Sequence, residues 1–220
     1  MTLPYKDSWE DTMDYESLIF DIDGTLWDSR ALVAEGYDIQ LRAEGLAHLC
    51  VTAEDLKPLF GKVMTEIADV IFASIPLPER YALMERCMAT ENRYLHENQC
   101  KIGYPGVRET IAALAEKYRL FIVSNSQRGY PELCIRKLGL EDYITAHKCF
   151  GDTGTEKGET IRRLMEEQKI QSAVYIGDTQ GDLEAAEKAG IGFIFAAYGF
   201  GTPDHWDKKI GKFQDLLTVL

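Results

Sequence analysis

The second half of the chain alternates between helical and strand patterns, and this alternation limits the possible folds more than any other feature. After the loop Tyr104-Pro105-Gly106, the sequence predicts helices over residues 107–117, 131–138, 156–168 and 182–189. It predicts strands over residues 120–123, 148–150, 173–176 and 192–196. The strands read as continuous apolar runs, which is typical of a parallel sheet covered by helices on both faces. The pattern therefore predicts an α/β fold with a doubly wound parallel sheet of the Rossmann-like kind.

A helical segment interrupts this core near its start. Residues 17–20 form an apolar run that predicts the first strand. From about residue 30 to 98 the apolar residues recur at helical spacing, and the clearest helix begins near Pro78 and extends to about Glu97. Because one strand precedes this segment and the others follow it, we expect an inserted helical module. The predicted division is a core domain of residues 1–29 and 101–220 and a helical domain of residues 30–100.

Composition limits the partners. At 220 residues the chain is long enough for a main domain with a smaller insert. Its 36 acidic and 24 basic side chains give a net charge of −12, so the surface would repel a nucleic-acid backbone. We therefore predict no nucleic-acid partner. A phosphate site on so acidic a chain needs local positive charge from lysine, backbone N–H groups or a metal.

Neither a leader nor a disulfide framework is expected. The first eight residues contain no apolar core of signal-peptide length, and no stretch is long enough to cross a bilayer. We expect a cytoplasmic protein with no membrane partner, either a monomer or a homodimer. The five cysteines are scattered without a CxxC pair, which indicates reduced packing residues.

Residues capable of chemistry stand just after the predicted strands, where ligands gather in an open parallel sheet. Three carboxylates near one another require a cation between them, and a set of hard oxygen ligands favours Mg²⁺. The residues in question are Asp21-Ile22-Asp23-Gly24-Thr25 after the first strand, Ser124-Asn125 after the second, Lys157 at the start of a later helix, and Gly177-Asp178-Thr179 with Asp182 after the fourth strand.

This set resembles the haloacid dehalogenase (HAD) superfamily. Its phosphatases carry a DxDGT loop, a Ser or Thr after the second strand, a lysine and a GDxxxD loop, and this chain has all four in that order. The inserted helices look like the family's α-helical C1 cap, as in phosphoglycolate phosphatases. Residues 151–155 lack the lysine-proline-x-proline run of many relatives. Tyr198-Gly199-Phe200-Gly201 is similar to a glycine-bearing segment of the family, although a plain turn explains it equally well.

The resemblance implies a role for each acidic residue. Asp21 would attack phosphorus and form an aspartyl-phosphate, while Asp23 would protonate the leaving oxygen and then activate water. Asp21, the backbone carbonyl of Asp23 and Asp178 would hold Mg²⁺. Asp182 would support that shell from outside.

The resemblance also implies a phosphate-binding set. Ser124 and Asn125 would donate hydrogen bonds to phosphate oxygens, and Lys157 would neutralise charge on the phosphate and the nucleophile. Gly24 and Thr25 would shape the first loop and complete this set. The predicted function is that of a magnesium-dependent phosphatase acting on a small phosphomonoester, with phosphoglycolate the first candidate by resemblance.

Several alternatives remain open. Dehalogenases lack the second aspartate, so Asp23 argues against that reaction. Sugar phosphomutases carry Glu-Asp where this chain has Gly177-Asp178, and a cap histidine where it has Val33, so both departures favour hydrolysis. A sugar phosphate, a nucleoside monophosphate or pyrophosphate would use the same core. A non-catalytic metabolite-binding relative is a further alternative, which the joint presence of the two loop aspartates and Lys157 disfavours.

Overall fold

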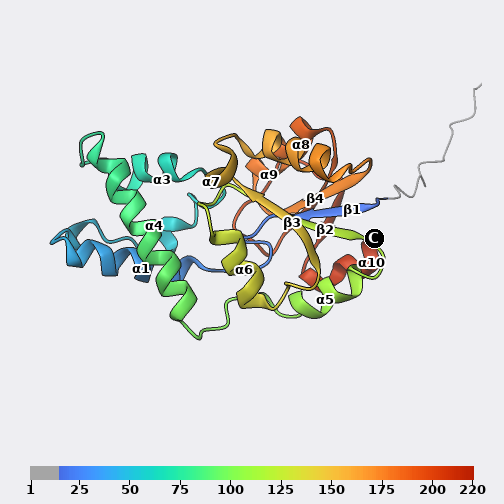
Figure 1. Cartoon of the computed structure of the whole chain (residues 1–220), viewed down its shortest axis with the longest axis horizontal. Helices are drawn as coiled ribbons and strands as arrows, with labels where there is room; N and C mark the ends of the chain where they lie inside the picture. Colours follow the sequence, from blue (N-terminus) through green and yellow to red (C-terminus); the bar gives the residue numbers. More distant parts are fainter. Residues whose placement is uncertain (1–14) are drawn as a thin grey trace, which may run out of the picture.

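Six parallel strands form a single sheet in a computed structural model that describes residues 15–220 (Figure 1). The sheet order is β3-β2-β1-β4-β5-β6. The strands are β1 Ser17–Phe20, β2 Arg119–Ser124, β3 Ile144–Cys149, β4 Ala173–Gly177, β5 Gly192–Ala196 and β6 Lys208–Ile210. The α/β prediction is confirmed. The prediction made for the first eight residues, and the first fourteen residues of the predicted core domain, lie outside the described part of the chain.

Register places the carboxyl ends of three strands side by side. Phe20, the last residue of β1, pairs with Ile122 of β2 and with Ile176 of β4. Asp21 therefore leaves the sheet beside the residues that follow β2 and β4. This is the edge at which a parallel sheet binds ligands.

Helices cover both faces of the sheet. Leu18 and Phe20 belong to one apolar cluster, while Ile19 between them belongs to the other, because successive strand residues face opposite sides. The first face packs against α5 Val107–Leu114, α6 Tyr130–Leu138, the 3₁₀ helix η2 Phe213–Asp215 and α10 Leu216–Val219. The second packs against α8 Lys157–Gln168 and α9 Gln180–Ala189.

The chain from residue 30 to 97, between β1 and α5, is helical, as predicted, and lies beyond the carboxyl ends of the strands (Figure 1). We call this insertion the cap. Gly36 allows α1 and α4 to pack closely, because a Cβ atom there would lie 2.9 Å from Glu91 Cα. The helices are α1 Arg30–Ala43, η1 Ala47–Leu49, α2 Ala53–Leu56, α3 Met64–Ile71 and α4 Glu79–Glu97.

Some element boundaries differ from prediction. β3 begins at Ile144 rather than near residue 148, and Phe150, predicted as strand, begins the short helix α7 Phe150–Thr153. β3 is a half-exposed edge strand with polar residues, so it lacks the apolar run of a central strand. The short edge strand β6 was not predicted. Among residues 15–220 no helix has the length and apolarity to cross a membrane, and all five cysteines are free.

Candidate active site

Lys157 joins two carboxylates at the centre of the sheet edge. Its Nζ donates hydrogen bonds to Asp21 Oδ1 at 2.8 Å and to Asp182 Oδ1 at 2.6 Å, and all three residues are buried. The lysine begins α8, so the helix fixes where its side chain enters the site. The structure therefore brings the predicted lysine to the predicted nucleophile, although residues 151–155 lack the family's usual loop sequence.

Burial and charge together set the protonation of this group. Burial raises the pKa of Asp21 to about 7, and the neighbouring Lys157 opposes that rise. Burial by itself would lower the pKa of Lys157, but Asp182 and Asp21 outweigh it and raise that pKa. Lys157 is therefore a permanent positive charge that helps to keep Asp21 ionised.

Asp23 lies in the same loop, but its side chain points to different partners. Its Oδ1 accepts hydrogen bonds from Trp27 Nε1 at 2.8 Å, Ser29 Oγ at 2.6 Å and Tyr130 OH at 2.9 Å. Burial raises the pKa of Asp23 to about 6, and the hydrogen bonds from Ser29, Tyr130 and Trp27 oppose that rise. Asp23 is thus a carboxyl group with a fixed orientation and a pKa near neutrality, as an acid–base residue requires.

Three buried carboxylates, including that of Asp21, form a cluster at the carboxyl ends of β1 and β4. Asp21, Asp178 and Asp182 each place one oxygen within 4.8 Å of the others. Asp182 is already engaged, because its Oδ1 bonds Lys157 while its Oδ2 accepts from the backbone N–H groups of Asp178 and Thr179. This contact caps α9 at Thr179, and it ties Asp182 to the loop that presents Asp178.

Asp178 is the member of this cluster that has a buried carboxylate oxygen without a hydrogen-bond partner in the described part of the chain. Its Oδ2 accepts the backbone N–H of Phe200 at 2.6 Å, but its Oδ1 is buried without a partner among the described residues. Burial, followed by the charges of Asp182 and Asp21, raises the pKa of Asp178 well above its usual value. An unpaired buried carboxylate oxygen is costly, and a set of hard oxygen donors fits a divalent cation. The cluster therefore fits a metal ion.

The segment Tyr198-Gly199-Phe200-Gly201 packs directly against this cluster. A Cβ atom on Gly199 would lie 2.4 Å from Asp178 Cβ, and one on Gly24 would lie 2.2 Å from Asp178 Oδ2. The two glycines thus allow two backbone segments to enclose the carboxylate. The sequence offered the glycines as a signal but could not distinguish this packing from an ordinary turn.

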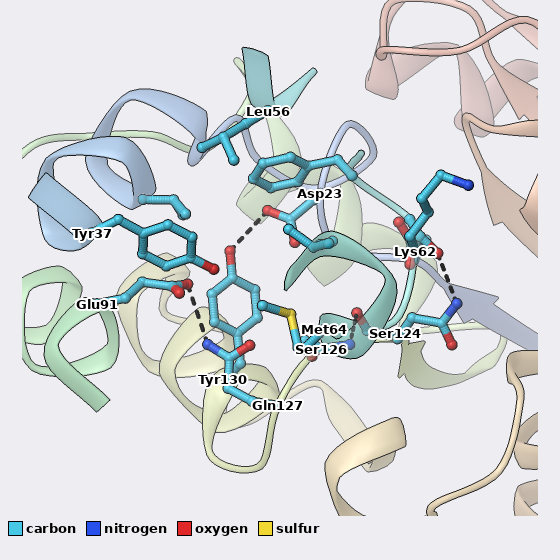
Figure 2. Close-up of a pocket in the computed structure, with 16 residues that line it drawn as sticks. Asp23, Tyr37, Leu56, Lys62, Met64, Glu91, Ser124, Ser126, Gln127 and Tyr130 are labelled. Carbon is cyan, nitrogen blue, oxygen red and sulfur yellow. Dashed lines mark hydrogen bonds between the residues drawn. The ribbon is translucent and has the colours of Figure 1, made fainter. Parts of the chain in front are cut away.

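The loop after β2 connects the core to the cap. Ser124 Oγ accepts the backbone N–H of Ser126, and Asn125 Nδ2 donates to the cap carbonyl of Gly61 at 2.7 Å (Figure 2). Within the described chain, Asn125 Oδ1 and Thr25 Oγ1 are buried without hydrogen-bond partners. Ser124 and Asn125 line the same pocket as Asp21, while the role of these two residues and of Thr25 in phosphate binding stays a prediction.

A pocket lies between these core residues and the cap. Asp21, Asp23, Ser124 and Asn125 contribute its core side, and apolar cap residues such as Leu56 line the other (Figure 2). Four further polar residues that the sequence did not single out also line it, namely Tyr37, Glu91, Gln127 and Tyr130. They lie on ordinary helices or loops far apart in the sequence, so no local motif marks them.

The family model of haloacid dehalogenase-like hydrolases matches residues 18–196, which include every residue that lines the pocket and the three clustered aspartates. The chain belongs to this hydrolase family. The α/β domain that carries the DxDGT loop and the buried aspartates is therefore the family's phosphatase core, and the inserted helices are its C1 cap. The cap's residue boundaries stay a prediction.

Relatives with two different names share this HAD architecture. The chain is 29% identical to phosphoglycolate phosphatase of Agrobacterium fabrum over 83% of this chain and 80% of that protein. It is 26% identical to pyrophosphatase PpaX of Listeria monocytogenes over 93% of this chain and 95% of that protein. A HAD-like hydrolase from Streptococcus pneumoniae has the same fold, with a TM-score of 0.78 at 18% identity, covering 93% of this chain and 97% of that one.

Proposed function

We propose that this enzyme is a magnesium-dependent phosphatase that hydrolyses a small phosphomonoester through an aspartyl-phosphate on Asp21. The observation that carries the proposal is the pairing of Asp21 with Lys157 beside a separately held Asp23 in one pocket. Lys157 favours the ionised form of Asp21, whose pKa burial raises to about 7, and the pKa of Asp23 is about 6. These are the properties that a nucleophile and an acid–base residue require.

The reaction has two steps. Both hydrogen bonds to the Asp21 side chain go to Oδ1, so we expect Oδ2 to attack phosphorus. As the bond from phosphorus to the leaving oxygen breaks, Asp23 gives that oxygen a proton. In the second step Asp23 takes a proton from water, the resulting hydroxide attacks phosphorus, and the bond to Asp21 breaks to release phosphate.

Asp21, Asp178 and the backbone carbonyl of Asp23 would hold the magnesium ion, with Asp182 orienting the loop that carries Asp178. Bound Mg²⁺ would screen the nucleophile from the phosphate and stabilise the transferring group. Support for a cation comes from the three clustered carboxylates and from the unpaired Oδ1 of Asp178. Ser124, Asn125, Lys157 and the first-loop residues Gly24 and Thr25 would bind the phosphate.

The cap favours a small phosphorylated metabolite, because a lid over the site restricts entry and excludes bulk water. Phosphoglycolate is the first candidate from the similarity to phosphoglycolate phosphatases. Pyrophosphate is the second, because the match to the Listeria pyrophosphatase spans nearly the whole chain. The absence of the phosphomutase residues, at Gly177 and Val33, favours hydrolysis over transfer within a sugar.

The test is hydrolysis of p-nitrophenyl phosphate with and without Mg²⁺. We expect turnover that requires the metal and is lost in Asp21→Asn, which keeps the shape of the side chain and removes its charge. Asp142→Asn, an exposed aspartate on the loop before β3, is the matched control and should keep full activity. Equal activity of Asp21→Asn and the wild type would overturn the assignment of the nucleophile.

A further inference from the structure

Glu91 is a buried carboxylate of the cap that faces the pocket. It lies on α4, is 2% exposed and lines the same cavity as Asp21 and Asp23 (Figure 2). Its Oε1 accepts a hydrogen bond from Gln127 Nε2 at 3.2 Å. Its Oε2 is buried and has no hydrogen-bond partner among residues 15–220. Such an oxygen is costly in an empty pocket and is satisfied when a bound molecule supplies a donor.

The backbone holds Glu91 in place. The close approach of α1 at Gly36 positions the Cα atom of Glu91, so the side chain has little freedom to leave the pocket. Tyr37, a fully buried residue of α1, lines the pocket beside Glu91 (Figure 2). Glu91 and Tyr37 therefore form a polar site on the cap side of the pocket, and the hydrogen bond from Gln127 joins this site to the loop after β2.

The cap side of the pocket offers little positive charge. Among the described residues that line the pocket, Lys62 is the sole lysine or arginine. Its side chain is 47% exposed and lies 3.7 Å from Glu66. The other cap residues at the pocket are mostly apolar, such as Val33 and Met64. A second anionic group on the substrate would thus meet Glu91 without a buried cation to balance it.

We propose that Glu91 binds the leaving group through Oε2 and selects one that ends in a hydroxyl or ammonium group over one that ends in a carboxylate or phosphate. This inference rests on the proposed phosphatase function and refines its substrate class. The relatives are named for phosphoglycolate and pyrophosphate, which both have anionic leaving groups. The proposal predicts that this enzyme disfavours leaving groups of that kind. Glu91 is a specificity residue here and takes no part in bond making.

The experiment uses three short phosphomonoesters that differ at one end: phosphoethanolamine, hydroxyethyl phosphate and phosphoglycolate. For the wild type we expect kcat/KM to favour the ammonium or hydroxyl compound over phosphoglycolate by about tenfold or more. Burial raises the pKa of Glu91 to about 8, so the assays are run at about pH 9, where its carboxyl group is ionised. Under these conditions Glu91→Gln should reduce that preference by about tenfold, because it keeps the shape of the side chain and removes its charge. Glu85→Gln, an exposed glutamate of the same helix, is the control and should keep the wild-type preference.

Two results would overturn the proposal. One is a wild-type preference for phosphoglycolate. The other is an unchanged ratio of kcat/KM values in Glu91→Gln, which would mean that Glu91 only links the cap to the core through Gln127. Binding of the three compounds to Asp21→Asn and to Asp21→Asn/Glu91→Gln by calorimetry measures the same preference without turnover. Failure of p-nitrophenyl phosphate hydrolysis in the wild type would count against the phosphatase function alone, whereas the ratio of dissociation constants still decides the role of Glu91.

Discussion

Lys157 Nζ lies 2.8 Å from Asp21 Oδ1, and the two side chains are each only 4% exposed. The same Nζ bonds Asp182, so one cation faces two carboxylates. A buried charge that loses its partner is strongly destabilising. We therefore expect the lysine both to stabilise the folded site and to favour the ionised form of Asp21.

We expect Lys157→Met to lower kcat/KM for p-nitrophenyl phosphate by about a hundredfold or more, because an electrostatic contact to the reacting group is lost. It should also reduce the free energy of unfolding by about 3–5 kcal/mol, as for a broken buried ion pair. Lys148→Met is the control, because its partner Glu167 is 56% exposed, and it should cost about 1 kcal/mol or less. Urea unfolding measures the stability, and full activity of Lys157→Met would remove the lysine from the mechanism.

Tyr130→Phe should change the pH dependence of the reaction more than its maximum rate. Tyr130 OH donates to Asp23 Oδ1, and a donor to the ionised form lowers a carboxyl pKa. Removing it should raise the pKa of Asp23 above about 6 and move the basic limb of the kcat/KM profile to higher pH. Tyr118→Phe, whose hydroxyl bonds the carbonyl of Leu220, should leave the profile in place. A shift to lower pH would contradict the role given to Asp23.

Gly199→Ala should damage the metal site in particular. Its Cβ atom would come within 2.4 Å of Asp178, so the carboxylate or the segment carrying Phe200 N must move. We expect weaker thermal stabilisation by Mg²⁺ and a higher magnesium concentration for half-maximal activity. Gly181→Ala is the control, because the nearest atom to its Cβ is 3.8 Å away. Equal magnesium dependence in both variants would show that the segment does not shape the site.

The proximity of Asp21 to the acidic loop at Asp178 could be predicted from sequence because parallel strands bring their carboxyl ends to one edge. Asp21 and Asp178 directly follow strands that pair in register, so a strand prediction also fixed their proximity. The edge strands β3 and β6 were predicted poorly or not at all. They are short or polar and half-exposed, and the apolar pattern that marks the central strands is missing from them.

The cap side of the pocket could not be read from the sequence. Glu91 and Tyr37 stand in ordinary helices, and nothing local distinguishes a glutamate that faces solvent from one that faces a cavity. Their proximity comes from the close packing of α1 on α4. Gly36 permits this packing, but the sequence around it does not indicate the contact. The partners of Asp23 are similarly spread, from Trp27 in the first loop to a tyrosine of α6.

Burial of Glu91 should make stability fall as pH rises. Burial is the largest of the effects that raise its pKa, from 4.5 to about 8 in the folded protein, with the hydrogen bond from Gln127 and the nearby Tyr37 opposing the rise. Between these values the folded state holds a proton that the unfolded state has released, so unfolding becomes easier with increasing pH, by at most about 1.4 kcal/mol per pH unit. Glu91→Gln has no such proton to lose.

The measurement is urea unfolding of the wild type, Glu91→Gln and Glu85→Gln across this pH range. The stability of Glu91→Gln relative to the wild type should increase with pH up to about pH 8 and then level off. Asp21 and Asp23 also have raised pKa values, but they are present in all three proteins and cancel in the difference. Glu85→Gln should run parallel to the wild type. Parallel curves for Glu91→Gln as well would mean that the pocket already keeps Glu91 ionised when empty, through donors other than a bound substrate.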